Sequence, residues 1–183
     1  MAAAKARINF TNFFLKPYQN WDSLYQPPTK PCSTSSISTL DRHSISGFAF
    51  FLGNGSVSWS SKKQSIVTLS STESEYVALT HAAKDVIWIH KLLAEISPIY
   101  PERPPPPSTL FCDNQGAIRL SKDSTFHART KHIDVHFHFI RQTVSQNQIS
   151  LDYIPTTDMI ADIFTKSLSF HKFSGFRSLL GVR

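Results

Sequence analysis

A single long helical pattern constrains the fold of this chain most strongly. The segment 70–96 has apolar residues at helical spacing, among them Tyr76, Leu79, Val86 and Leu93. Recurrence at intervals of three and four residues predicts an amphipathic helix with one face against a core. The proline-rich stretch that follows, "SPIYPERPPPPS", ends the helix because proline lacks a backbone N–H and clashes with the preceding turn. The remaining elements must therefore pack around one long helix.

Shorter patterns on both sides of this helix predict an α/β fold. Before it, the alternating residues of 47–63 flank Gly53-Asn54-Gly55, which is typical of a β-hairpin. After it, the patterns predict strands near 109–112 and 148–154, and helices near 115–121, 134–146, 156–168 and 171–181. This order of elements indicates helices layered on a sheet: a hairpin, a helix, a strand, two helices, a strand and a helix.

The N-terminal quarter of the chain lacks such patterns. Residues 1–40 have little periodicity, and "QPPTKPCSTSSISTL" is rich in proline and serine. This composition favours loops or disorder over packed elements. We therefore expect a divergent, loop-rich or disordered segment at 1–40 and one α/β domain at 41–183.

Composition narrows the class of partner. Nineteen Lys and Arg against thirteen Asp and Glu leave a formal net charge of +6, which suits an anionic partner such as nucleic acid. Two cysteines, Cys32 and Cys112, are too few for a disulfide framework, so a reduced intracellular setting is expected. No apolar run approaches the ~18 residues of a membrane span, and the first residues lack a secretory apolar region. We expect no membrane partner and no secretion.

Three acidic residues each have a structural and a catalytic interpretation. Glu75 follows Thr72 by three residues, which matches a helix capping box. Asp113 closes the apolar stretch "TLFC" and fits a cap or a turn acid. Asp162 lies within an apolar stretch, where helix propensity disfavours aspartate unless its side chain is solvated or has another role.

Together, the same three acids match the way in which two-metal sites are assembled. One lies on the first turn of the long helix, one at the end of a strand and one on a late helix. Mg²⁺ takes oxygen ligands and retains waters and substrate phosphates in its shell. Two such ions about 4 Å apart hold the attacking water and the leaving oxygen of a phosphodiester in line. Spacing alone leaves open whether the three carboxylates converge.

Three long blocks carry a specific family pattern. They are "DRHSISGFAFFLGNGSVSWSSKKQSIVTLSSTESEYVAL", "LFCDNQGAIRLSKDSTFHARTKHIDVHFHFIR" and "YIPTTDMIADIFTKSL". From Asp41 to about Leu180 the chain resembles the ribonuclease H domain of copia-type retrotransposon Pol polyproteins, and it is close to plant members. The resemblance implies a ribonuclease H-like mixed sheet with flanking helices, which cuts the RNA strand of RNA–DNA hybrids with two Mg²⁺ ions on four acids. It places Glu75, Asp113 and Asp162 as the second, third and fourth acids, and Glu73 as a capping neighbour.

The first acid of that family departs from the pattern here. Family members carry Asp-x-Asp-Trp-Ala-Gly at the end of a central first strand, and an ungapped count places Cys32 and Thr34 at its two acids. Neither residue is a carboxylate, so the first strand is expected to be replaced or missing. Weaker Mg²⁺ binding and a rate loss on the order of 10³-fold or more should follow. Whether Asp22 or Asp41 takes the vacant position stays open.

A second hypothesis is nucleic-acid binding without catalysis. The candidate contacts are Lys62, Lys63, Arg129, Lys131, His132 and Arg141. Phosphate contacts give salt-dependent, sequence-tolerant binding, and a solvated basic face is the structural alternative. The four-residue spacing of His132 and His136 would suit a shared zinc ion, but no cysteine or glutamate completes a familiar ligand set.

The resemblance also indicates partners. In a parent polyprotein this domain would act beside reverse transcriptase and integrase domains on an RNA–DNA hybrid, in the cytoplasm or the nucleus. A third hypothesis is a transposon-derived reading frame without a selected function. Detection of the protein in cells would distinguish that hypothesis from the first two.

Overall fold

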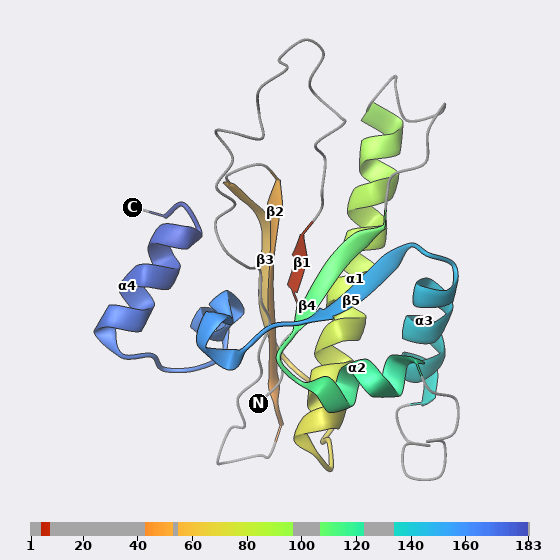
Figure 1. Cartoon of the computed structure of the whole chain (residues 1–183), viewed down its shortest axis with the longest axis horizontal. Coiled ribbons are helices and arrows are strands. Elements are labelled where there is room, and N and C mark those ends of the chain that lie inside the picture. The colour runs from red at the N-terminus through yellow and green to blue at the C-terminus, as the bar shows by residue number, and fades with distance from the viewer. Residues whose placement is uncertain (1–4, 8–42, 53–54, 97–106, 123–133, 183) are drawn as a thin grey trace.

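One mixed β-sheet organises the described part of the chain (Figure 1). The structure, a computed structural model, describes residues 5–7, 43–52, 55–96, 107–122 and 134–182. Its elements are β1 (Lys5–Arg7), β2 (Ile45–Leu52), β3 (Gly55–Lys63), α1 (Ser71–Ile96), β4 (Ser108–Cys112), α2 (Gln115–Lys122), α3 (Asp134–Ser145), β5 (Ile149–Tyr153), the 3₁₀ helices η4 (Thr156–Asp158) and η5 (Ile160–Phe164), and α4 (Phe170–Leu179). The predicted hairpin, long helix, later strands and α/β class are confirmed.

The five strands lie in the order β3-β2-β1-β4-β5. β2 and β3 are the antiparallel arms of the predicted hairpin, and β4 pairs with β5 in parallel. β1 pairs in parallel with β2 and antiparallel to β4. Because β4 and β5 point the same way, their carboxyl ends lie at one edge of the sheet, where Asp113 follows β4.

The central strand β1 comes from the segment that was expected to be loop-rich. It is three residues long and fills the slot between β2 and β4, whose facing edges would otherwise lack hydrogen-bond partners. In the register, Lys5 lies opposite Phe111 and Arg7 opposite Thr109, so β1 starts near the Asp113 edge and runs away from it. An acid at the carboxyl end of this strand would therefore lie at the opposite edge. Positions 32 and 34, and the aspartates at 22 and 41, lie outside the described residues.

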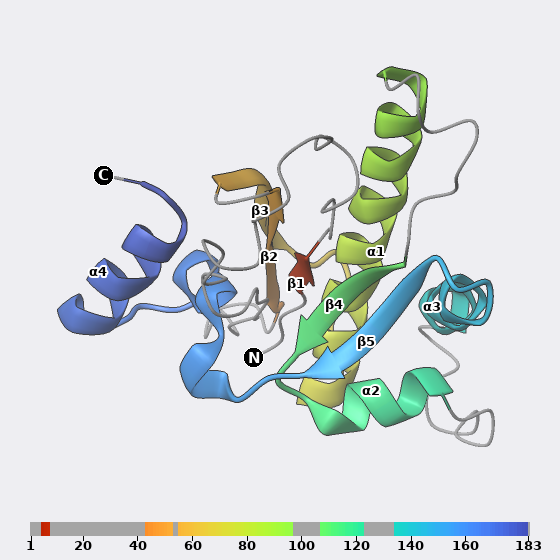
Figure 2. The same ribbon diagram turned by 45° about the horizontal axis from the view of Figure 1, so that its top comes forward.

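Strand β2 is buried on both faces, which explains its almost unbroken apolar sequence. Phe48 and Phe50 face the core formed with α1, α2 and α3, whereas Ala49 and Phe51 face a second core formed with η5 and α4. Figures 1 and 2 show the sheet between these two helical layers. In the described part of the chain, no helix is both long and apolar enough to cross a membrane.

The predicted helix at 156–168 is wrong in type. The chain forms the two short 3₁₀ helices η4 and η5 instead, and the Asp162 N–H donates to the Met159 carbonyl three residues back at 3.1 Å. η5 packs closely on β2 at Gly47, where a Cβ would lie 2.6 Å from Thr165 Cγ2. The Asp162 side chain on η5 is buried, whereas the exposed face of a regular helix would have left it in solvent.

Candidate active site at the end of strand β4

Glu75 does not cap helix α1. The helix begins at Ser71, so Thr72 lies inside it, and the capping box predicted for Thr72 and Glu75 is wrong. Ser70 and Glu73 cap the helix instead: the Glu73 N–H donates to Ser70 Oγ at 3.2 Å, and the Leu69 N–H donates to Glu73 Oε2 at 2.7 Å. The role assigned to Glu73 is thus confirmed. Glu75 lies two residues further along the helix and is 1% exposed, so its buried carboxylate does not cap the helix.

Asp113 does not cap helix α2 either, because its neighbour does. The Ala117 N–H donates to Asn114 Oδ1 at 3.0 Å, which makes Asn114 the N-cap. Gly116 lets this end of α2 approach α1, since a Cβ there would lie 3.1 Å from Thr72 Oγ1. The close packing of the two helix starts brings the loop that carries Asp113 beside the first turns of α1.

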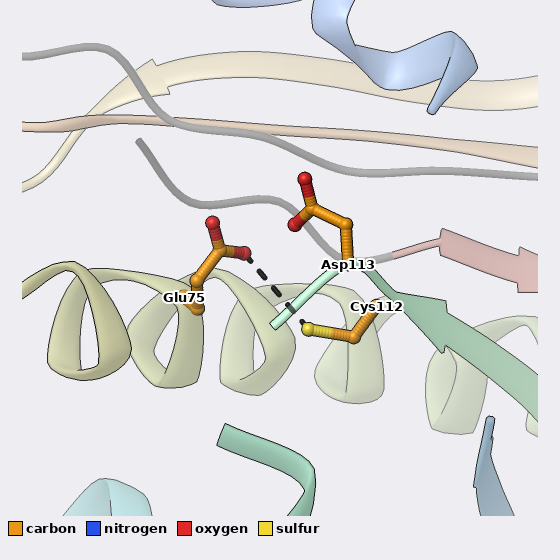
Figure 3. A group of neighbouring side chains, drawn as sticks. All are labelled: Glu75, Cys112 and Asp113. Atoms are coloured by element: carbon orange, nitrogen blue, oxygen red, sulfur yellow. Dashed lines mark hydrogen bonds between the residues drawn. The ribbon is translucent and has the colours of Figure 1, made fainter. Parts of the chain in front are cut away.

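The carboxylates of Glu75 and Asp113 converge with the thiol of Cys112. One ligand atom from each of the three residues lies within 4.8 Å of the others. Figure 3 shows the two carboxyl groups and the sulfur around one space between α1 and the end of β4. Cys112 is the last residue of its strand, so the strict alternation of side chains stops there and Asp113 can turn toward the same point.

Burial dominates the electrostatics of Asp113. Desolvation raises the pKa of its carboxyl, and the nearby charge of Asp162 raises it further. The Thr156 hydroxyl donates to Asp113 Oδ2 at 2.9 Å, and this hydrogen bond lowers the pKa, as does the charge of Lys166. A carboxylate that is partly desolvated beside other acids is typical of a cation-binding site.

Asp162 lies near this cluster but is held by two lysines. Its Oδ1 accepts from Lys166 Nζ at 2.8 Å and its Oδ2 from Lys172 Nζ at 3.4 Å, while the Asp162 side chain is only 1% exposed. The solvated-face interpretation is wrong, because the side chain is buried. Of the three predicted acids, the structure groups Glu75 and Asp113 with Cys112, and it leaves Asp162 adjacent and ion-paired.

The basic candidates are only partly described. Lys62 and Lys63 are exposed at the end of β3. Arg141 lies half-buried on α3, where its charge lowers the pKa of Tyr76 on α1 against a larger increase from burial. The other three, Arg129, Lys131 and His132, lie outside the described residues.

A histidine pair joins α1 to α3 beside this basic surface. The rings of His81 and His136 are edge-on with centroids 6.4 Å apart. Burial lowers the pKa of His81 to about 4, helped by the charges of His136, Lys84 and Lys62. The pKa of His136 is also lowered, by burial and by Lys84. Both imidazoles are therefore neutral near pH 7. His132, the hypothesised zinc partner of His136, lies outside the described residues.

This pair predicts a pH-dependent loss of stability. His81 titrates near pH 6.5 when unfolded and near pH 4 when folded, so the unfolded state binds more protons between these values. The free energy of unfolding should fall as pH drops from 6.5 toward 4, by about 1–2 kcal/mol after allowance for solvent screening. Urea unfolding across this range should show a shallower pH slope for His81→Gln. Replacement of the exposed His138 by Gln should keep the wild-type slope, and equal slopes for wild type and His81→Gln would contradict the assignment.

Several site residues escaped sequence reasoning. Cys112, Thr156, Lys166 and Lys172 all contact the predicted acids. One indication for Cys112 was its position in the sequence, directly before Asp113. The last residue of a buried strand lies close to the first side chain of the loop that follows it. Lys166 follows Asp162 by four residues, which is the spacing of a helical ion pair and was also an indication. Lys172 gave none, since its contact with Asp162 depends on the packing of α4.

Comparison with known proteins shows homology to plant retrotransposon polyproteins. The chain is 40% identical over 142 residues to the retrovirus-related Pol polyprotein from transposon TNT 1-94 of Nicotiana tabacum, a match that covers 78% of the chain and 10% of that protein. It is 41% identical over 142 residues to the Pol polyprotein from transposon RE1 of Arabidopsis thaliana, covering 78% of the chain and 9% of the relative. The chain thus spans about a tenth of the length of these relatives. No family model and no solved structure match it.

Proposed function

We propose that this homologue of plant retrotransposon Pol polyproteins is a ribonuclease H domain that cuts the RNA strand of RNA–DNA hybrids weakly. One observation carries the proposal: Glu75 of α1 and Asp113 at the end of β4 place ligand atoms within 4.8 Å of one another. The homology supports it, because a polyprotein of a retrotransposon is a natural setting for such a domain. In the longer polyprotein, reverse transcriptase and integrase domains would be its partners.

The donor set fits a divalent cation. Two carboxylates supply the hard oxygen ligands that Mg²⁺ prefers, and Asp162 adds a third carboxylate whose charge acts on Asp113. Glu75 and Asp113 would hold the ion, and the Thr156 hydroxyl would keep the Asp113 carboxylate oriented. When bound, Mg²⁺ lowers the pKa of an attacking water and stabilises the negative charge that develops on the leaving oxygen.

The charge of the site explains why we propose weak activity. The described residues contribute Glu75 and Asp113 directly, whereas the Asp162 carboxylate is neutralised by Lys166 and Lys172. β1 (Lys5–Arg7) begins beside the Asp113 edge of the sheet, and none of its three residues carries a carboxylate. Two cations would therefore be held by fewer anionic ligands than the family uses, so their affinity and the rate should both fall.

Replacement of Asp113 by Asn tests the proposed activity. The substitution keeps the size of the side chain and removes its charge, so Mg²⁺-dependent cleavage of the labelled RNA strand should fall at least about 100-fold. The exposed Asp152 on neighbouring β5 provides a matched control, and Asp152→Asn should cut at the wild-type rate. Cleavage that persists in Asp113→Asn, or in the presence of a chelator, would reject this site as its source.

Exposed residues on β3 favour a second candidate function, nucleic-acid binding without catalysis. Trp59 is 61% exposed, and Lys62 and Lys63 follow on the same strand. Because residues two apart share a face, Trp59 and Lys63 project from the side opposite α1, while Lys62 contributes to the positive field at His81. An aromatic ring that can stack on a base, and a basic side chain on the same face about 13 Å further along the strand, are both features of single-strand binding surfaces.

Salt dependence tests that second candidate. Fluorescence anisotropy with a labelled hybrid in the absence of Mg²⁺ should show affinity that falls steeply between about 50 and 200 mM salt. Lys62→Ala and Lys63→Ala together should weaken binding and reduce the salt slope by about two. As a control, Lys91→Ala removes an exposed charge on α1, away from β3. It should leave both the affinity for the hybrid and the salt slope close to the wild-type values. Affinity that does not depend on salt would contradict phosphate recognition.

A further inference from the structure

The two lysines at Asp162 hold its carboxylate unequally. Lys166 follows Asp162 by four residues, its ammonium lies 2.8 Å from Oδ1, and its side chain is 14% exposed. Lys172 comes from a separate element, α4, its ammonium lies 3.4 Å from Oδ2, and its side chain is 33% exposed. An ion pair that is longer and more open to water is the weaker one. A competing cation would therefore displace Lys172 before Lys166.

The Lys172 ammonium lies close to the carboxylates of the proposed Mg²⁺ site. It also donates to the Thr156 carbonyl at 3.4 Å, and the Thr156 hydroxyl donates to Asp113 Oδ2 at 2.9 Å. The charge of Asp162 raises the pKa of Asp113, so these two carboxyl groups are near enough to interact. One ammonium thus contacts both the third predicted acid and the residue that orients Asp113.

Release of Lys172 would leave its partners satisfied. The Thr156 carbonyl also accepts from the Met159 N–H at 3.3 Å, so it keeps a hydrogen bond. The carboxylate that Lys172 contacts keeps the closer ion pair with Lys166. Because Lys172 already reaches solvent, its freed ammonium would be hydrated at once. The ammonium can therefore leave without exposing an unpaired buried group.

We propose that Lys172 is a displaceable counter-ion that occupies the Asp162 carboxylate until a divalent cation takes its place. A divalent ion brings two charges to an oxygen that Lys172 neutralises with one, so the two compete. When Mg²⁺ binds, Lys172 moves to solvent and α4 loses its link to Asp162. By linkage, the contact from α4 lowers the affinity for Mg²⁺, and bound Mg²⁺ weakens the hold on α4. The inference rests on the proposed function, because it requires Mg²⁺ to bind beside Glu75, Asp113 and Asp162.

Calorimetric titration of the full chain with Mg²⁺ tests the proposal without reference to cleavage. Lys172→Met removes the ammonium and keeps an unbranched side chain beside the Phe176 ring, whose centroid lies 5.1 Å from Lys172 Nζ. We expect Lys172→Met to bind Mg²⁺ at least about threefold more tightly than the wild type does. Lys122→Met is the matched control, because Lys122 is an exposed lysine at the end of α2, whereas Asp162 pairs with Lys166 and Lys172. This control should keep the wild-type affinity.

The outcomes separate this inference from the proposed nuclease activity. Equal affinity in the wild type and Lys172→Met, an equal gain in Lys122→Met, or no Mg²⁺ binding by Lys172→Met would overturn it. If Lys172→Met fails to fold, hydrogen exchange of the wild type is the second test: saturating Mg²⁺ should speed exchange of the α4 amides, and unchanged exchange would contradict displacement. A wild type that does not cleave the hybrid while Lys172→Met gains affinity refutes only the nuclease proposal. A wild type that cleaves it while the two affinities are equal refutes only the displacement of Lys172.

Discussion

A chimera that restores the family's first strand is expected to cut RNA–DNA hybrids at least about 10³-fold faster than the present chain. Residues 1–40 would be replaced by the corresponding segment of a plant relative that carries Asp-x-Asp-Trp-Ala-Gly. The physical reason is the direction of β1, which runs antiparallel to β4 and so starts at the Asp113 edge. A strand parallel to β4 would end at that edge and deliver its carboxylate beside Glu75 and Asp113. The measurement is single-turnover cleavage of a labelled hybrid with Mg²⁺.

The control for the chimera separates chemistry from folding. A second chimera with the first Asp of the restored pattern replaced by Asn rebuilds the same central strand without the metal ligand. Both chimeras should gain stability over the present chain, because a longer central strand pairs more of β2 and β4. Only the first chimera should cleave the hybrid faster than the present chain does. Equal cleavage by the two chimeras would show that the missing acid does not limit activity.

Replacement of Asp162 by Ala is expected to lower the free energy of unfolding by about 2–4 kcal/mol. The Asp162 side chain is 1% exposed and pairs with Lys166 and Lys172, whose side chains are 14% and 33% exposed. Removal of the carboxylate leaves two ammonium groups close together and partly desolvated. Because Lys172 remains accessible to water, the loss should lie toward the lower end of that range. Urea unfolding with a spectroscopic probe measures the change.

Two variants define how the Asp162 pair acts. The triple replacement Asp162→Leu, Lys166→Met and Lys172→Met removes all three charges, so it should recover most of the lost stability. Asp152→Ala on exposed β5 removes an aspartate without a buried ion pair and should stay within about 0.5 kcal/mol of wild type. If Asp162→Ala is as mild as Asp152→Ala, the two lysines do not hold Asp162 in solution.

Replacement of the half-buried Asp113 and replacement of the buried Asp162 should affect the stability of the fold differently. Asp113→Asn removes a carboxyl whose pKa burial raises, so without metal it should not destabilise the fold. Asp162→Ala removes one that two lysines stabilise. Their local sequences distinguish these roles only in part, since each aspartate follows a short apolar run but only Asp162 has a lysine, Lys166, four residues later. The distinction comes from what the rest of the chain places around each side chain.

Helix ends show how far sequence patterns reach. The pattern correctly predicted that α1 would start within "SSTESE" and would carry a capping box, but it chose Thr72 and Glu75 instead of Ser70 and Glu73. Both pairs have the required spacing, and a shift of two residues decides which glutamate caps the helix and which one faces the end of β4. Packing of α1 against the sheet settles that register, because it selects the helix face that must be buried.

By itself the sequence determined the α/β class, the order of the later elements, the three candidate acids and the similarity to plant Pol polyproteins. These follow from local patterns of apolar residues and turns, and from long blocks that resemble a family. Only the tertiary structure decided that β1 runs antiparallel to β4, that Cys112 joins Glu75 and Asp113, and that lysines hold Asp162. Those contacts join residues far apart in the chain, and their geometry depends on how whole elements pack.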